Sequence, residues 1–199
     1  MTTPLERNDR YIREFVEALH ICPYARTCRT SGKLHRRVLD GLDQALPAMH
    51  EVEAMAEDAV EVALLIFPGA RADGLESARE FESFCASLRP SLTKFYCVAF
   101  HPDLPRDLFD AHRAVQLIRR SPDPTIQMVR ASVLRAVRGV SDGGTRVIDP
   151  SKMTLEELMA VASPLSLADR IAEANLATLH REGPDTIERL LSDFRRNDG

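Results

Sequence analysis

A cysteine followed by proline lies in the stretch ALHICPYARTC, residues 18–28. Pro23 lacks a backbone N–H and biases Cys22 toward an extended conformation, so the sulfur points away from a continuing helix. A thiolate here needs a nearby cation, which His20, Arg26 and Arg29 could supply. The pattern predicts a reactive thiolate or, because thiolates can bind haem iron, an axial ligand. The alternative is a buried helix terminus, since free cysteine is often buried.

A zinc site is a second interpretation of the same region, with the residue types that tetrahedral zinc prefers. Its ligands would be His20, Cys22, Cys28 and His35. The spacing does not match the usual zinc patterns, and neither CxxC nor HxxxH occurs in the chain. The sequence therefore disfavours structural zinc, and the missing CxxC also disfavours a thioredoxin-like dithiol.

A histidine follows the apolar run KFYCVAF, residues 94–100. His101 would then lie at the carboxyl end of a strand, where sites in α/β sheets commonly gather. Imidazole can act there as a base, a metal ligand or a hydrogen-bond anchor. The alternative is that His101 and Asp103 only close a turn. We treat His101 as a candidate catalytic residue and metal ligand.

Two adjacent arginines open the segment RRSPDPT, residues 119–125. Asp123 fits the N-cap of a following helix, and Pro124 fits its first residue. Arginine side chains and free backbone N–H groups at a helix start suit a carboxylate or phosphate, such as a haem propionate or an acidic substrate. The alternative is a capped helix–helix turn with solvated arginines. The candidate binding residues are Arg119, Arg120 and Ser121.

Apolar spacing predicts the elements that must position these residues. A helix is expected over residues 5–20, ending before Pro23. The apolar runs at 60–67 and 94–100 predict buried, neighbouring strands of one sheet. A helix over 75–89, capped by Asp73 and Glu76, would join them and pack on the sheet. Its expected core residues are Phe81, Phe84 or Cys85, and Leu88. Cys97, inside the second strand, is also expected in the core.

Helical spacing recurs through the rest of the chain. It predicts helices at 38–49, at 104–118 and from Ile126 to Val137. The C-terminal third should be helical, with a capping box at Thr154 and Glu157 and a break at Gly183-Pro184. A short strand is possible at 143–149. The pattern predicts an α+β fold: one helix-rich domain, residues 1–199, around a small sheet that contains a strand–helix–strand unit.

Composition narrows the classes of function. Hydrophobic residues make up 44% and charged residues 28% of the chain, which is typical of a globular protein. The net charge of −4 disfavours a nucleic-acid partner. No apolar run is long enough for a membrane helix, and no signal peptide is recognisable, so we expect a cytoplasmic protein with no membrane partner. The cysteines should then be reduced.

Four motifs, HICPYA, AFHPD, RSPDP and ANLATLHREG, occur in an order and spacing that resembles a bacterial family catalogued as domain of unknown function 1415. The resemblance covers about residues 10 to 183, and the helix-like segment between Asp103 and Arg119 departs from it. It implies a soluble α+β domain but no established reaction. The family pattern falls on Cys22, Pro23, Tyr24, Phe100, His101, Pro102, Arg120, Ser121, Pro122 and Pro124.

A thiol, an imidazole and a guanidinium from distant motifs favour one pocket made by Cys22, His101 and Arg120. Our first hypothesis is an iron enzyme, most plausibly a haem-dependent oxidoreductase acting on a small acidic metabolite, with Cys22 or His101 as axial ligand and Arg119, Arg120 and Ser121 binding propionates or substrate. The second is a cofactor-free enzyme with Cys22 as nucleophile. The third is a non-catalytic protein that binds an anion or a partner. The sequence predicts no oligomeric state.

Overall fold

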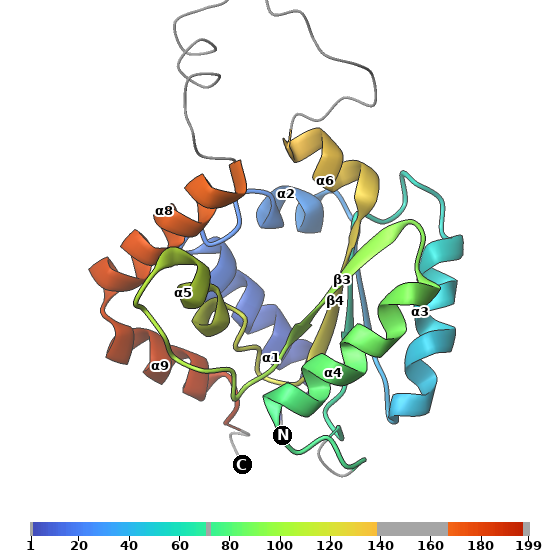
Figure 1. Cartoon of the computed structure of the whole chain (residues 1–199), viewed down its shortest axis with the longest axis horizontal. Coiled ribbons are helices and arrows are strands. Elements are labelled where there is room, and N and C mark those ends of the chain that lie inside the picture. The colour runs from blue at the N-terminus through green and yellow to red at the C-terminus, as the bar shows by residue number, and fades with distance from the viewer. Residues whose placement is uncertain (1, 71–72, 139–166, 197–199) are drawn as a thin grey trace, which may run out of the picture.

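A four-stranded mixed sheet forms the centre of the computed structural model, which describes residues 2–70, 73–138 and 167–196. The strands lie in the order β1-β2-β4-β3; β1 and β2 are parallel, and β4 is antiparallel to both of its neighbours. Figure 1 shows helices on both faces of this sheet. The strand bounds are β1 Leu34–Val38, β2 Val62–Ile66, β3 Phe95–Phe100 and β4 Thr125–Arg130.

Each face of the sheet has its own hydrophobic core. One core packs α3 (Ala45–Ala54) and α4 (Ala78–Leu88) against alternate strand residues such as Leu65 and Cys97. The other core, which contains Leu64, is covered by the N-terminal helix and by helices from the second half of the chain (Figure 1). These helices are α1 (Pro4–Arg10), η1 (Tyr11–Glu17), α5 (Ala111–Ile118), α8 (Leu167–Glu182) and α9 (Pro184–Asp193).

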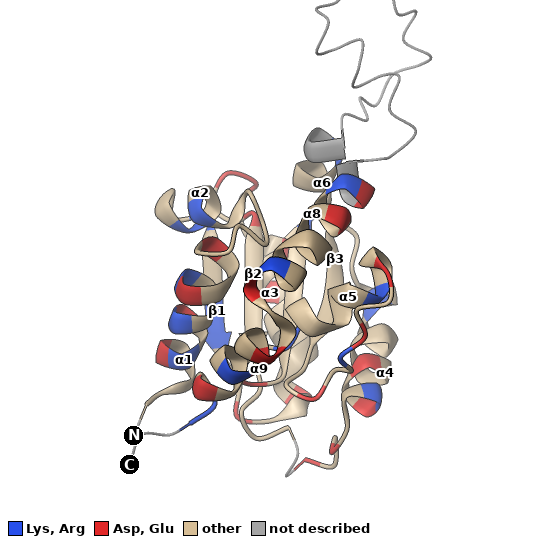
Figure 2. Ribbon diagram, turned by 90° about the vertical axis from the view of Figure 1, so that its left-hand side faces the viewer, with Lys and Arg blue, Asp and Glu red and all other residues tan. Residues whose placement is uncertain are grey.

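The remaining described elements are short connections around these layers. They are α2 (Ala25–Thr30), η2 (Leu42–Gln44), η3 (Arg89–Ser91) and α6 (Ala131–Arg138). Figure 2 shows basic and acidic residues interspersed along the outer helices, as expected for helices that exchange ion pairs with each other and with loops.

The two predicted strands are present, but the prediction that they are neighbours is wrong. Strand β4 lies between β2 and β3 and pairs with both. The strand–helix–strand unit with adjacent parallel strands is instead β1-α3-β2. Helix α4 still packs on the sheet as expected, through Phe81 and Cys85, with Phe84 and Leu88 beside them. Its capping box is formed by Ser77 and Glu80, not by Asp73 and Glu76.

Strand β4 occupies the first half of the helix predicted from Ile126 to Val137. Residues 125–130 are buried or half-buried throughout, because a central strand is covered on both faces. The apolar spacing continues into α6, so one periodic pattern covers a strand and then a helix. Short apolar runs cannot be assigned by periodicity alone, which explains the error.

Strand β1 was also missed, because its sequence LHRRV contains three basic residues. It is an edge strand, and edge strands commonly carry charged side chains that discourage pairing with other chains. Arg36 and Arg37 use their charge locally, in ion pairs with Asp9 and Glu51. The helix predicted over 38–49 therefore begins later, at Ala45.

The N-terminal helical segment ends before the proline that was expected to stop it. The π-helical turns of η1 end at Glu17, and His20 adopts a left-handed conformation with φ of 54°. The N–H of Ile21 then donates to the carbonyl of Val16 at 2.9 Å, which closes the helix end. Pro23 lies beyond this closure.

The α+β class is confirmed, with helices at the C-terminus as predicted. Gly183 separates α8 from α9 at φ of 85°, a conformation that glycine adopts readily, and Pro184 begins α9. The predicted strand at 143–149 and the capping box at Thr154 and Glu157 lie outside the described residues. Among the described helices, none is both long enough and apolar enough to cross a membrane.

Candidate anion-binding site

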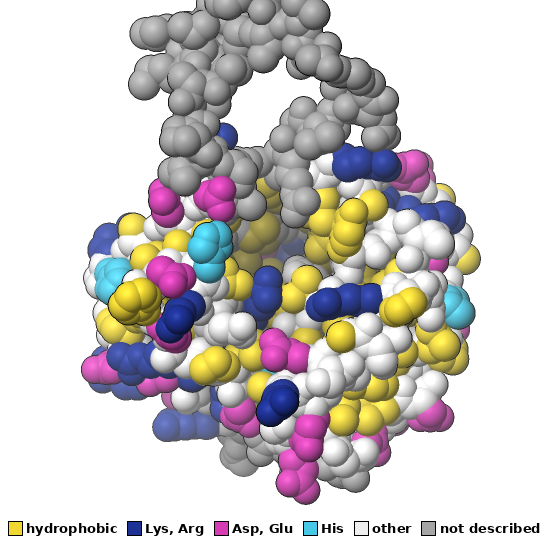
Figure 3. Space-filling view, viewed as in Figure 1, with side chains coloured by type: hydrophobic (Ala, Val, Ile, Leu, Met, Phe, Trp, Pro, Cys, Tyr) yellow, Lys and Arg dark blue, Asp and Glu magenta, His cyan; other side chains and the backbone are white. Residues whose placement is uncertain are grey.

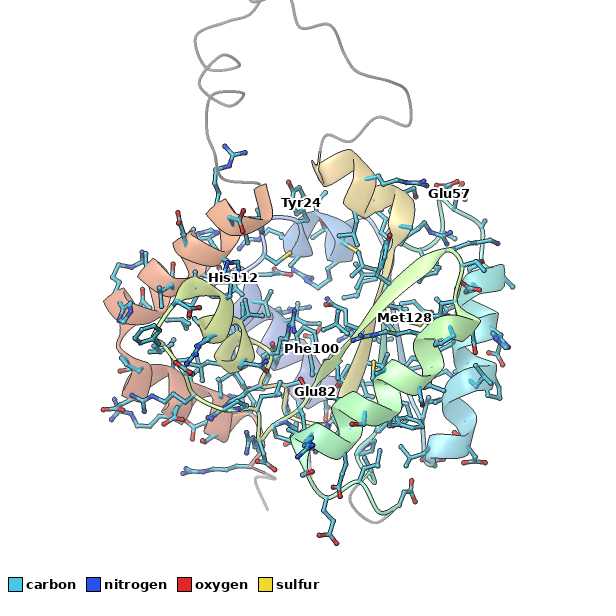
Figure 4. The ribbon with its side chains drawn as sticks, in the orientation of Figure 1. Tyr24, Glu57, Glu82, Phe100, His112 and Met128 are labelled. Carbon is cyan, nitrogen blue, oxygen red and sulfur yellow. The ribbon has the colours of Figure 1, made fainter. Side chains whose placement is uncertain are left out.

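A pocket of about 300 Å³ lies between helix α4, strand β3 and the residue that follows helix α5. Figure 3 shows the molecule hollowed between α5 and β3, with Lys and Arg side chains along the hollow. Figure 4 labels Glu82 on α4 and Phe100 at the end of β3 in this region. The pocket is lined by Arg79, Glu82, Ser83, Ala86, Arg89, Val98, Ala99 and Arg119.

Arg119 is the most enclosed cation of the pocket. It follows the last residue of α5, and its backbone carbonyl accepts hydrogen bonds from the N–H groups of His101 at 3.1 Å and Ser121 at 2.9 Å. Its half-buried side chain is thereby directed from a fixed backbone. Burial lowers the pKa of Arg119, and the positive charge of Arg89 acts in the same direction, while Glu82 opposes the shift.

Arg79 and Arg89 add two exposed guanidinium groups to the pocket, from the first turn of α4 and from η3. In the described part of the chain, no carboxylate oxygen lies within 4.0 Å of a side-chain nitrogen of these residues or of Arg119. Glu82 is the single acidic residue of the lining. The pocket therefore has an excess of positive charge, whereas many other arginines of the protein form ion pairs.

The free edge of β3 adds backbone groups to the pocket. The carbonyl of Cys97 accepts from Arg89 Nε at 3.2 Å, and the N–H of His101 donates to Arg119, so both groups face away from β4. In an antiparallel strand, the polar groups of alternate residues face the same side. Ala99 lies between these two positions, so its N–H and C=O also face the pocket. An anion would meet a neutral donor there as well as the arginines.

His101 is placed at the end of β3, as predicted, but inside the protein. Its side chain is fully buried, Nδ1 accepts a hydrogen bond from the N–H of Asp103 at 3.1 Å, and its ring lies 5.8 Å from that of Phe81. The N–H of Leu104 donates to the His101 carbonyl at 3.3 Å, which closes a turn. These contacts favour the turn-closing alternative, and the backbone of His101 helps to fix Arg119.

Cys22 is exposed, and the arginines expected to stabilise its thiolate bind another residue. Arg29 donates to both carboxylate oxygens of Glu17 at 2.6 and 2.9 Å, and Arg26 approaches the same carboxylate at 3.5 Å. The hydrogen bonds from Arg29 lower the pKa of Glu17, which is almost fully buried. Cys28, the other cysteine of this region, is buried in α2, and burial raises its pKa to about 11.

Cys22 and His101 lie toward opposite ends of the sheet. Cys28 lies in α2, the helix that follows Cys22, and its carbonyl accepts a hydrogen bond from the N–H of Lys33. The next residue, Leu34, begins β1 and pairs with Val62, so Cys22 is near this end of the sheet. His101 follows Phe100, which lies at the opposite end of the sheet, next to Thr125 and Ile66. A five-residue strand spans roughly 13 Å between these ends. The structure does not bring Cys22 and His101 together, and their roles as ligands or catalytic residues stay predictions.

Arg120 lies near His101 but is used within the fold. Its Nε donates to the carbonyl of Leu104, and its Nη1 donates to Glu188 of α9 at 2.7 Å. The side chain is only 17% exposed. Arg120 therefore joins the loop after β3 to the C-terminal helix.

Ser121 lies in a buried connection, and the helix predicted to begin at Asp123 is absent. The Ser121 hydroxyl donates to the carbonyl of Asp123 at 2.6 Å. The Asp123 carboxylate accepts from Arg7 Nε at 3.1 Å and Nη2 at 2.8 Å, and strand β4 begins at Thr125. The helix start that was expected to offer backbone N–H groups to an anion is therefore absent, and the binding roles of Arg120 and Ser121 stay predictions. Of the three proposed anion-binding residues, only Arg119 lines the pocket.

Comparison with known families supports the resemblance seen in the motifs. The family model described as "Protein of unknown function (DUF1415)" matches residues 4–160. The chain belongs to this family. No curated protein and no solved structure matches this chain. The family description assigns no activity, so the chemistry of the pocket is the guide to function.

Sequence reasoning missed the residues that α4 contributes to the pocket. Arg79, Ser83 and Ala86 recur at intervals of four and three residues, which places them on one face of α4. This spacing could have identified a shared polar face. It could not have shown that the face lies beside Arg119, which is distant in sequence. Within the described residues, no group of three His, Cys, Asp or Glu side chains is arranged to hold a metal ion.

Proposed function

We propose that this protein binds a small anion with more than one negative charge, a carboxylate or phosphate compound, in the pocket lined by Arg79, Arg89 and Arg119. The observation that carries the proposal is the half-buried guanidinium of Arg119, which faces the pocket without a carboxylate partner among the described residues. A buried cation is costly unless it is paired. A bound anion would supply the missing partner.

The lining suggests the class of ligand. Three guanidinium groups and one carboxylate leave two positive charges, which match a dianion. Arginine binds planar carboxylates and phosphates through paired hydrogen bonds, and the Ser83 hydroxyl offers a further polar contact. The volume of about 300 Å³ lies at the lower end of the range for metabolite pockets. The ligand is therefore a small acidic metabolite, in line with the partner predicted from the sequence.

The haem oxidoreductase and the Cys22 nucleophile remain separate, untested hypotheses. Neither Cys22 nor His101 lines the arginine pocket, so the geometry of this pocket adds nothing to either one. We also propose that the protein works in the reducing cytoplasm. All four cysteines are free thiols in the structure, which suits that compartment.

Calorimetric titration with inorganic phosphate and with citrate at low ionic strength tests anion binding. Arg119→Gln removes the enclosed charge and should weaken binding by roughly ten- to a hundredfold, since a hydrogen bond to a charged group contributes about 1.5–3 kcal/mol. Arg181→Gln is the matched control, because Arg181 is 65% exposed on α8 and pairs with Glu182. Equal affinity in the wild-type protein and Arg119→Gln, or no binding of either anion, would refute the proposal.

A further inference from the structure

Two cysteines that are distant from Cys22 face each other beside the arginine pocket. Cys85 lies on α4 and Cys97 on β3, and their sulfurs are 3.8 Å apart. Both side chains belong to the hydrophobic core, with Cys85 fully buried and Cys97 only 4% exposed. A disulfide needs a sulfur–sulfur distance of about 2.05 Å, so the sulfurs must approach by roughly 1.8 Å. A small adjustment of α4 against β3 would bring them into bonding distance.

Arg89 connects this thiol pair to the pocket. It lines the pocket, and its Nε donates a hydrogen bond to the carbonyl of Cys97. Its positive charge also favours the thiolate form of both cysteines. The hydrogen bond from Cys85 and the positive charge of Arg89 lower the pKa of Cys97, against the effect of burial. The same pairing raises the pKa of Cys85. The pairing therefore favours a thiolate on Cys97 over one on Cys85, and the 3.8 Å between the sulfurs places the second thiol within reach of the first.

We propose that Cys85 and Cys97 form a reversible disulfide, and that its formation increases the affinity of the neighbouring arginine pocket for anions. The first half of this inference concerns the thiols alone. The second half rests on the proposed function of the pocket.

A hydroperoxide is the oxidant class that completes the chemistry. The Cys97 thiolate attacks the terminal peroxide oxygen, an S–O bond forms, the O–O bond breaks, and the departing oxygen takes a proton to leave as water or an alcohol. The Cys85 sulfur then attacks the Cys97 sulfenic acid. The S–S bond forms, the S–O bond breaks, and water leaves with the Cys85 proton. Two thiols lose two electrons and the peroxide gains them; a small thiol reverses the change by exchange.

The effect on the pocket follows from charge. In the reduced protein, negative charge on Cys97, which the lowered pKa of this thiol favours, would compete with a bound anion for Arg89 and repel the anion. A disulfide is neutral, so oxidation removes this competition and leaves Arg89 available to the ligand. Loss of one nearby negative charge in a partly exposed site should tighten anion binding by roughly five- to tenfold.

Peptide mass spectrometry of the full chain tests the disulfide. A Cys22→Ser background removes the exposed thiol, and the protein is treated with a modest excess of hydrogen peroxide before the remaining thiols are alkylated under denaturing conditions. We expect a Cys85–Cys97 linked peptide that dithiothreitol removes. Cys28 is the internal control, because it is buried, its pKa is raised, and no other cysteine sulfur is within hydrogen-bonding distance of it among the described residues. Alkylation of Cys85 and Cys97 to the same extent before and after peroxide would overturn the inference.

Phosphate titration of the oxidised and reduced proteins tests the coupling. The oxidised protein should bind phosphate more tightly, and Cys97→Ala should bind it equally well before and after peroxide treatment. A disulfide that forms without changing phosphate affinity would overturn the coupling. If the disulfide forms but neither protein binds phosphate or citrate, the proposed function fails while the disulfide site stands. The two failures are thus distinguishable.

Discussion

Replacement of Arg119 by methionine should stabilise the protein and impair anion binding at the same time. Methionine keeps an unbranched, flexible side chain, although a shorter one, and removes the charge. The backbone interactions at this position persist, because the carbonyl, not the side chain, accepts from His101 and Ser121. The position after α5 has φ of −92° and ψ of 8°, which methionine can adopt.

The size of both effects follows from the surroundings of Arg119. Burial and the nearby charge of Arg89 lower its pKa, so the folded state disfavours the charged form that is present at neutral pH. Removing a half-buried, unpaired charge should therefore increase the free energy of unfolding by about 1 kcal/mol. For a chain of this size, that change raises the melting temperature by about 2–4 °C. The loss of a charge-assisted contact should weaken anion binding by roughly ten- to a hundredfold.

Thermal unfolding in anion-free buffer and in phosphate separates these effects. Wild-type protein should be stabilised by phosphate, because a ligand that binds the folded state raises its stability. Arg119→Met should melt higher than wild type without phosphate and gain little from its addition. A fall of more than about 2 °C in anion-free buffer would refute the reasoning, since it would mean that the guanidinium stabilises the fold.

The remaining predictions concern ion pairs and thiols. Arg29→Ala should lower the free energy of unfolding in urea by about 2–4 kcal/mol, because this change leaves the almost fully buried Glu17 carboxylate without its main partner. Glu17→Gln, which removes the carboxylate charge itself, should cost less, and equal losses in the two variants would contradict this. Arg120→Ala should lower the melting temperature by several degrees and leave phosphate affinity unchanged, since its partners are structural. Because its pKa is lowered, the Cys97 thiolate stabilises the fold above the usual thiol pKa, and this contribution is lost as the pH falls through the lowered pKa. Binding of sulfate, whose charge is constant in this range, should conversely weaken as the pH rises through the lowered pKa of Cys97, but not in Cys97→Ser. If iron is bound through sulfur, the absorption spectrum of iron-replete protein should change in Cys22→Ser, and an unchanged spectrum would exclude that ligand.

The part of the fold that was predictable consists of elements whose pattern admits one interpretation. The apolar run in β2 and the amphipathic face of α4 were both identified correctly, because local burial produced their patterns. The strand order was not predictable from these runs. Strand β4 takes its place between β2 and β3 through long-range pairing, and its residues also fit the spacing of a helix. The charged strand β1 shows that an edge strand can form with only two apolar residues, Leu34 and Val38.

The candidate site illustrates a different limit. Arg119 was selected as an anion-binding candidate because a helix was expected to begin after it; strand β4 begins there instead, yet Arg119 does line the pocket. Neighbouring Arg120 has the same chemistry and the same motif, yet it pairs with Glu188. Two adjacent residues at a helix end point in different directions, so one faces the pocket and the other the C-terminal helix. Side-chain direction, which a motif does not encode, decides between ligand binding and structure.

The thiols show the same limit more clearly. Cys22 attracted attention because proline follows it, whereas Cys85 and Cys97 belong to no short motif and are 12 residues apart. Their approach depends on the packing of α4 across β3, and the effect on Cys97 depends on Arg89, which follows α4. The absence of a CxxC motif excludes only a pair of cysteines that are three positions apart in the sequence. Where a helix packs on the next strand, inward-facing cysteines on both can meet, so a dithiol should be sought in the core contacts as well as in the sequence spacing.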